Sequence, residues 1–232
     1  IPIDPHYLAW KLPSLDFQAR VDSLGQTESS YSLESAEIHE LDPLWELLGV
    51  PLPNGLSGPF RARGRVWGSV LEPERFAADV TLTSNRLLFQ QESFSLKASG
   101  RWAEERLTLE NVEARAGKGS INAQGVLPLS EGAGRYSLKG SIENLSVGGL
   151  LQSVDIEGGG VLQGSFDVHG AASIPETVME LRLSPLTIEG QRGEISLRAR
   201  TEGSQLYLDA VEARMGAATM RGHGELDLAT RA

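Results

Sequence analysis

The chain has 232 residues, of which 40% are hydrophobic and 22% charged, a balance typical of a folded protein. Its 31 acidic residues against 21 Lys and Arg give a formal net charge of −10, which argues against nucleic acid as a partner, because phosphate backbones bind clustered basic side chains. The absence of cysteine excludes disulfides, thiolate catalysis and thiolate zinc sites. No apolar run approaches the roughly 20 residues of a membrane helix, and the pattern starts and stops abruptly, so we expect an internal segment of a longer protein.

Along the chain, hydrophobic residues recur with a period of two. Such runs lie at 17–21, 94–98, 107–109, 112–114, 136–142, 179–183, 195–199, 206–210 and 226–228. This alternation places aliphatic side chains on one face of a strand and polar side chains on the other. Continuous Val and Ile runs, typical of strands buried on both faces, are missing. We therefore predict an all-β fold of mostly antiparallel strands, with one apolar face and one solvated face.

Helix and turn signals agree with this prediction. The best helix signal is Leu41–Gly49, where Asp42 is a candidate N-cap, Pro43 the first helical residue and Gly49 the stop. Glu104-Glu105 and Glu202-Gly203-Ser204 separate alternating runs at the distances of β-hairpins. The sequence thus predicts at most one or two short helices among many strands.

A repeat of about 100 residues organises the chain. The segment Val112–Gly117 recurs as Val211–Gly216, and Gly125–Leu129 corresponds to Gly224–Leu228 at the same offset of 99. We expect residues 1–40 to end a preceding repeat, with repeat one at 41–130 and repeat two at 131–232 in one continuous structural unit. Repeats of this kind stack edge to edge, which predicts a long, curved antiparallel sheet.

Motifs for catalysis are weak. The four histidines, His6, His39, His169 and His223, have no metal-ligand spacing. Gly158-Gly159-Gly160 lacks the lysine and the following helix of a phosphate-binding loop, and we expect it to form a bend between repeats. We predict no catalytic residues, no metal site, no cofactor and no enzymatic activity.

The aliphatic stripe is the candidate functional feature. Only 6% of residues are aromatic, whereas a sugar- or base-binding face would stack its ligand on Trp or Tyr. Alkyl chains gain about 0.8 kcal/mol per buried methylene without directional contacts, so they suit an aliphatic surface. The alternative is the core of an ordinary β-sandwich. The candidate lipid-groove residues are Val80, Leu82, Phe94, Leu96, Leu107, Leu109, Ile121, Leu138, Ile142, Leu181, Leu183, Ile195, Leu197, Leu206 and Leu208.

Several short motifs carry a resemblance to a known family. Leu52-Pro53 precedes Gly58 and Gly64-Arg65-Val66-Trp67-Gly68, and Val112–Arg115 is followed by Gly119–Gly125. The second copy, Gly164–Leu228, contains Gly222-His223-Gly224 in its last strand. From about Tyr31 onward this pattern resembles the repeat of AsmA/TamB-type proteins.

The resemblance implies a taco-like β-sheet with a hydrophobic groove, in a periplasmic protein anchored in the inner membrane of a Gram-negative envelope. Such proteins are thought to bridge the inner and outer membranes and to conduct phospholipid acyl chains. An Omp85-type outer-membrane barrel is the implied partner, through parts of the parent absent here. Two alternatives stay open: a scaffold that assembles outer-membrane proteins of the autotransporter type through β-edge templating, and a plain β-sandwich or adhesin-like stalk.

Overall fold

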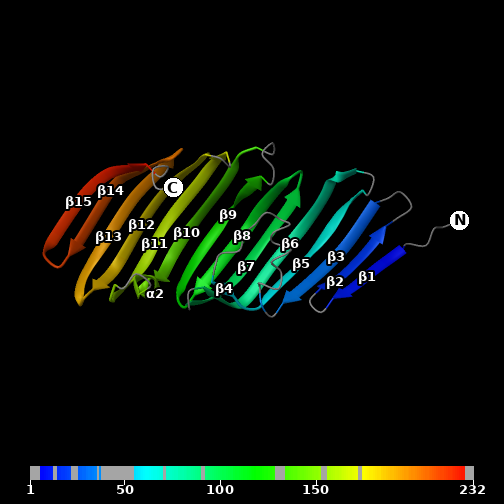
Figure 1. The fold of residues 1–232 in the computed structure, drawn as a ribbon, viewed down its shortest axis with the longest axis horizontal. Coiled ribbons are helices and arrows are strands. Elements are labelled where there is room, and N and C mark those ends of the chain that lie inside the picture. The colour runs from blue at the N-terminus through cyan, green and yellow to red at the C-terminus, as the bar shows by residue number, and fades with distance from the viewer. Residues whose placement is uncertain are drawn as a thin grey trace. The chain divides into compact units, whose positions relative to one another are not determined.

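The computed structural model describes residues 6–12, 15–21, 26–35, 37, 55–69, 72–89, 92–128, 134–152, 156–171 and 174–227. These residues form an all-β protein of antiparallel strands with one short helix, which confirms the predicted fold class (Figure 1). The helix predicted at Leu41–Gly49 lies outside the described residues. None of the described helices has the length and hydrophobicity needed to cross a membrane.

The chain divides into two compact units, Ile1–Val112 and Glu113–Ala232. Their boundary falls inside strand β8 (Arg106–Ala116) rather than between the two sequence repeats. The strands of the first unit are β1 (His6–Leu12), β2 (Leu15–Val21), β3 (Gln26–Ser35), β4 (Leu56–Ser57), β5 (Phe60–Ser69), β6 (Glu72–Phe89) and β7 (Glu92–Ala103). They form a sheet in the order β1-β2-β3-β5-β6-β7, and the short β4 pairs with the end of β6.

The second unit also consists of antiparallel strands. Its elements are β9 (Gly119–Pro128), β10 (Tyr136–Ser146), α2 (Gly148–Gln152), β11 (Gly158–Ala171), β12 (Ile174–Ile188), β13 (Gln191–Glu202), β14 (Gln205–Met215) and β15 (Ala218–Asp227). The strands pair antiparallel in chain order from β9 to β15, so this sheet is an open meander. The predicted bend at Gly158–Gly160 is wrong, because these residues begin β11 and pair with Leu186–Ile188 of β12.

Hairpin turns form where the sequence predicts them. Glu104 and Glu105 connect β7 to β8 with φ angles of 51° and 57°. Two consecutive residues with positive φ make the turn whose twist matches that of the flanking strands. Gly203, with a φ of 61°, lies between β13 and β14.

The sequence repeat is also a repeat of structure. The strands β7, β8 and β9 begin and end 99 residues before β13, β14 and β15. Register shifts fall at Ser84/Leu87 of β6 and at Leu183/Leu186 of β12, which are again 99 residues apart. Leu87 and Leu186 are the largest fully buried side chains among the described residues, with exposed fractions of 1% and 0%.

The first unit has a compact hydrophobic core at this position. Its buried residues are Leu33, Leu56, Phe60, Ala62 and Leu87. Leu56 belongs to β4, which pairs with Leu88 and Phe89 at the end of β6, so the chain between β3 and β5 contributes to this core. In the second unit, buried Val147 donates a backbone hydrogen bond to Gly160, the register partner of Leu186.

Candidate functional site

Strand register in the second unit brings the aliphatic residues onto one face of the sheet. Directly paired residues share a face, and every second residue along a strand returns to it. The first cross-strand row is Ile121, Ile142, Gly164, Leu181, Leu197, Val211 and Gly222. The second row is Ala123, Gly140, Phe166, Met179, Ala199, Leu208 and Gly224.

Two further rows flank these. One consists of Gly125, Leu138, Val168, Thr177, Thr201, Leu206 and Leu226. The other consists of Leu145, Leu162, Leu183, Ile195, Ala213 and Met220. We call these four rows the unit 2 apolar face. Its two paired threonines are linked, because the backbone amide of Thr177 donates to the Thr201 hydroxyl over 2.9 Å.

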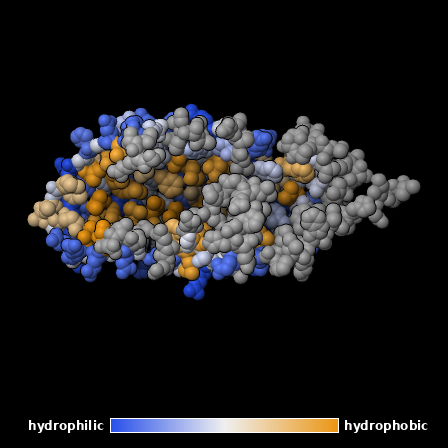
Figure 2. Space-filling model, in the orientation of Figure 1, coloured by the Kyte–Doolittle hydropathy of each residue, from blue (hydrophilic) through white to orange (hydrophobic). Residues whose placement is uncertain are grey.

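The unit 2 apolar face is partly open to solvent. All nine predicted groove residues on it are half-buried: Ile121, Leu138, Ile142, Leu181, Leu183, Ile195, Leu197, Leu206 and Leu208. Toward β15 the face is more open, with Leu226 38% and Met220 60% exposed. In the part of this unit that the structure describes, the strands contact their sheet neighbours, and α2 contacts β11. Figure 2 shows hydrophobic residues gathered over these strands, with hydrophilic residues along the margins.

The predicted groove residues of the first unit have a different environment. Val80, Leu82, Phe94 and Leu96 lie on the face that carries the buried core. Leu82, Phe94 and Leu96 pack directly against that core and are only partly exposed. Leu107 and Leu109 are half-buried on β8, and Leu107 Cδ1 would lie 3.5 Å from a Cβ placed on Gly100.

Sequence reasoning missed several residues of the unit 2 apolar face. Three of them lie on β11: Leu162, Phe166 and Val168. They alternate with polar residues as the predicted residues do, so the sequence pattern was sufficient to predict them. Leu208 and Val211 both belong to the face although they are three positions apart, because a register shift lies between them. A strict period of two does not identify such a pair.

The opposite face of the sheet is charged. In the second unit, cross-strand ion pairs join Lys139 to Asp167 at 2.9 Å, Arg198 to Glu180 at 2.8 Å, and Arg221 to Glu212 at 3.3 Å. Glu194 lies between two arginines, at 3.0 Å from Arg182 and 3.1 Å from Arg214. These side chains are well exposed, so each pair contributes about 0–1 kcal/mol. The ion pairs keep this face solvated, and the two faces differ sharply in polarity.

Contacts within the fold raise the pKa values of Tyr31 and Arg200. In the first unit, burial and then the nearby Asp79 carboxylate raise the pKa of Tyr31, whose hydroxyl donates to the Asp79 carbonyl. On the charged face of the second unit, a hydrogen bond to Asp209 raises the pKa of exposed Arg200. The guanidinium of Arg200 also lies 4.2 Å from the ring centre of Tyr207.

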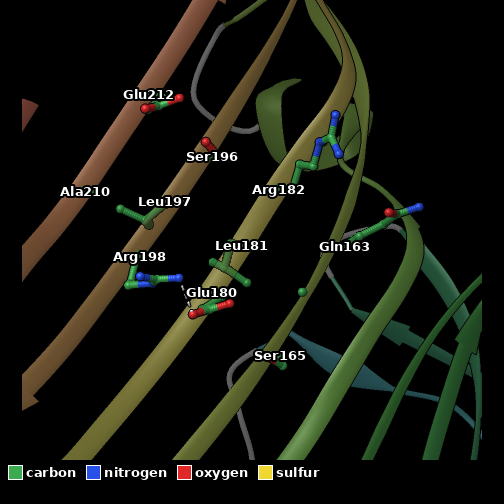
Figure 3. Close-up of a pocket in the computed structure, with 11 residues that line it drawn as sticks. Gln163, Ser165, Glu180, Leu181, Arg182, Ser196, Leu197, Arg198, Ala210 and Glu212 are labelled. Atoms are coloured by element: carbon green, nitrogen blue, oxygen red, sulfur yellow. Dashed lines mark ion pairs between the residues drawn. The ribbon is translucent and has the colours of Figure 1, made fainter. Parts of the chain in front are cut away.

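A shallow hollow of about 470 Å³ lies on the strands β11–β14 (Figure 3). Its lining residues are Gln163, Gly164, Ser165, Glu180, Leu181, Arg182, Ser196, Leu197, Arg198, Ala210 and Glu212. Arg182 and Arg198 are each paired with a glutamate, so the hollow offers no uncompensated positive charge to an anion. Among the described residues, no three His, Asp or Glu side chains are grouped to hold a metal ion.

Comparison with protein-family models, with curated proteins and with solved structures finds no match for this chain. The resemblance to AsmA/TamB-type proteins therefore stays a prediction. A fold class alone does not specify a function, whereas the chemistry of a surface limits which ligands it binds. The distinguishing feature of the second unit is an open aliphatic face on a sheet whose other face is charged.

Proposed function

We propose that the unit 2 apolar face binds the alkyl chains of phospholipids. The observation that carries this proposal is the partial exposure of its aliphatic rows, which an ordinary sandwich core would bury. In the proposed role the protein is a periplasmic segment of an inner-membrane-anchored, envelope-spanning protein, and acyl chains pass along it between the inner and outer membranes. The AsmA/TamB resemblance supports the cellular setting, and the face supports the ligand class.

The chemistry of the face favours alkyl chains over other ligands. Phe166 is the single aromatic residue in its four rows, so stacking on sugars or bases has little support. Each methylene that leaves water for this surface gains about 0.8 kcal/mol and needs no hydrogen-bond partner. Headgroups would remain in water beside the hydrophilic margins.

The extent of the face also suits an extended chain. A row crosses the strands β9 to β15 in the second unit. With about 4.8 Å between neighbouring strands, the row extends over roughly 29 Å. Because several rows lie side by side, an alkyl chain is able to shift between equivalent positions without breaking directional contacts, as conduction requires.

The test is a matched pair of charge substitutions on β13. Leu197→Arg places a cation in the middle of the apolar face, whereas Ser196→Arg places the same cation next to it on the charged face. After incubation with palmitoyl-oleoyl phosphatidylethanolamine, native mass spectrometry should find bound lipid on the wild-type protein and on Ser196→Arg. Leu197→Arg should bind about tenfold less or weaker still, because burying an unpaired charge against alkyl chains is costly.

Circular dichroism and thermal melting are the control that both variants remain folded. A lipid-free wild-type protein, or equal lipid on the two variants, would contradict the proposal.

A separate observation favours the alternative function, a scaffold that assembles outer-membrane proteins. Residues 218–226 of β15 are all exposed, and β15 is the last described strand of the second unit. An exposed strand edge is a template for another strand. If templating of outer-membrane proteins is the activity, Leu197→Arg should leave it intact in cells while changes on the β15 edge remove it.

A further inference from the structure

A group of basic side chains lies on the charged face of the first unit, opposite the face that carries the buried core. It consists of two neighbouring cross-strand rows on β5, β6 and β7, which we call the unit 1 basic patch: Arg61, Thr83 and Lys97 in one row, and Arg63, Thr81 and Ser99 in the other. Directly paired residues lie on the same face of a sheet. β6 therefore presents two threonines between the arginines of β5 and the lysine of β7.

The cations of the patch outnumber the carboxylates that pair with them. Arg61 and Arg63 share the carboxylate of Glu34, at N–O distances of 2.6 and 3.8 Å, and their side chains are 47% and 60% exposed. Among the described residues, no carboxylate pairs with the exposed Lys97. Three cations less one carboxylate leave two positive charges in excess, in a chain whose formal net charge is −10.

The same excess continues beside the patch. The Asp79 carboxylate lies 3.4 Å from the guanidinium of Arg65 and 3.1 Å from that of Arg101, so it too is shared by two cations. Both arginines are more than half exposed. Their charges are therefore accessible to the same partner as those of the patch.

The second unit provides an internal comparison. Because β6 and β12 are offset by 99 residues, Thr81 corresponds to Glu180. The equivalent rows of the second unit all belong to the lining of the hollow in Figure 3: Gln163, Arg182 and Ser196 in one row, and Ser165, Glu180 and Arg198 in the other. There the cations are compensated, since Arg198 pairs with Glu180 over 2.8 Å and Arg182 pairs with Glu194 over 3.0 Å. The charge excess thus comes from the residues of the first unit and not from the architecture of the sheet.

We infer that the unit 1 basic patch binds the phosphate groups of anionic phospholipids at the surface of a bilayer. The guanidinium groups of Arg61 and Arg63 have the planar fork that binds phosphate oxygens through two hydrogen bonds. Lys97 adds a point charge from the other side of β6, and the hydroxyls of the two threonines between them are hydrogen-bond donors. This inference does not depend on the binding of alkyl chains by the unit 2 apolar face.

The open form of the patch favours a bilayer over a single dissolved anion. The patch extends across three neighbouring strands, about 10 Å, and an exposed ion pair is weak by itself. A bilayer presents many phosphates at once, and each Lys or Arg near an anionic membrane surface strengthens binding about fivefold. Because the rest of the chain is acidic overall, we expect the contact to be confined to this part of the surface.

Vesicle sedimentation with two matched double variants tests the inference. Arg63→Gln with Lys97→Gln removes two cations of the patch, whereas Arg182→Gln with Arg198→Gln removes two cations at equivalent rows of the second unit, so both variants have the same net charge. The wild-type protein and the second variant should bind phosphatidylcholine vesicles more tightly when these contain phosphatidylglycerol. The first variant should lose this gain, with binding to the mixed vesicles about 25-fold weaker. Circular dichroism is the control that both variants remain folded.

A single substitution tests the charge of the patch in a second way. Thr81→Glu gives β6 the residue that β12 has as Glu180, and its carboxylate lies beside Arg63 in the same row. This variant should bind the mixed vesicles about fivefold more weakly or weaker still, because the added carboxylate compensates one cation. Thr81→Gln has the same size without the charge and should bind them as the wild-type protein does.

Competition experiments identify the source of the phosphate. Inorganic phosphate, added at constant ionic strength, should leave vesicle binding unchanged, and displacement by it would overturn the assignment to a bilayer. Equal binding of the two double variants, or no effect of phosphatidylglycerol, would overturn the inference. Binding to polyglutamate without binding to the mixed vesicles would assign the patch to an acidic polypeptide instead.

The two lipid proposals are separated by their readouts. Arg63→Gln with Lys97→Gln should bind palmitoyl-oleoyl phosphatidylethanolamine in native mass spectrometry as the wild-type protein does, because the unit 2 apolar face is unchanged. Failure of the alkyl-chain proposal is therefore distinguishable from failure of this one.

Discussion

At the scale of single residues, exposure separates leucines that hold the fold together from leucines that offer a surface. Leu186 and Leu197 both lie in the second unit on neighbouring strands. Leu186 is fully buried at the register shift of β12, whereas Leu197 is half-buried in the middle of the unit 2 apolar face. Truncating the Leu186 side chain leaves a cavity, whereas truncating Leu197 mainly changes a solvent-accessible surface.

Alanine substitutions should reveal this difference. Leu186→Ala should lower the free energy of unfolding by about 2–5 kcal/mol, the range for buried leucines. Leu197→Ala should lower it by about 1 kcal/mol or less, because part of that side chain is already in water. Urea denaturation followed by circular dichroism measures both values. Equal losses would mean that the face is covered in solution, in conflict with an open lipid-binding surface.

At the scale of elements, glycine decides how neighbouring strands approach each other. Gly164 of β11 is overlaid by Leu181 of β12 and lies against the Glu180 carbonyl, so it has no room for a side chain. Gly159, near the start of the same strand, has no atom within 4 Å of the corresponding position. Two glycines of one strand therefore have different roles.

Alanine at these two positions should have opposite consequences. Gly164→Ala forces β11 and β12 apart and should cost about 1–3 kcal/mol of stability, as overpacking does. Gly159→Ala should be neutral or stabilise the protein by about 0.5–1 kcal/mol, because glycine loses the most conformational freedom on folding. Urea midpoints of the two variants provide the comparison. A stable Gly164→Ala would show that this strand contact is less tight than the structure indicates.

At the scale of the whole molecule, equivalent positions of the sequence repeat have different surroundings in the two units. Leu82 and Leu181 occupy the same repeat position, 99 residues apart, on β6 and β12. Leu82 packs against the buried core of the first unit, to which Leu56 and Phe60 contribute. Leu181 lies on the open face of the second unit. The first unit is thus the more self-contained of the two, and the second carries the more accessible apolar surface.

The same substitution at these equivalent positions should therefore have unequal effects. Leu82→Arg brings a charge against a packed core and should destabilise the protein by about 3 kcal/mol or more. Leu181→Arg should leave the protein folded, since its guanidinium reaches solvent from an open face. Thermal melting monitored by circular dichroism distinguishes the two variants. Cooperative unfolding of Leu181→Arg at the temperature of Leu82→Arg would argue against an open second unit.

The sequence alone determined which residues share a face and where the strands repeat. Alternation is a local property of an extended backbone, so runs such as those of β12, β13 and β14 predicted the apolar side correctly. The offset of 99 residues predicted equivalent strands, because equal turn chemistry stops a strand at equal positions.

Only the tertiary structure decided how exposed each apolar residue is and where the alternation slips. The shifts at Leu183/Leu186 and Leu208/Val211 depend on the partner strand, which no local pattern encodes. What packs beside a face also depends on the tertiary structure: Leu82 and Leu181 occupy the same repeat position and are both half-buried, but only Leu82 packs against the buried core of the first unit. The open aliphatic surface is therefore a property of the assembled sheet, since it is defined by which neighbours are present.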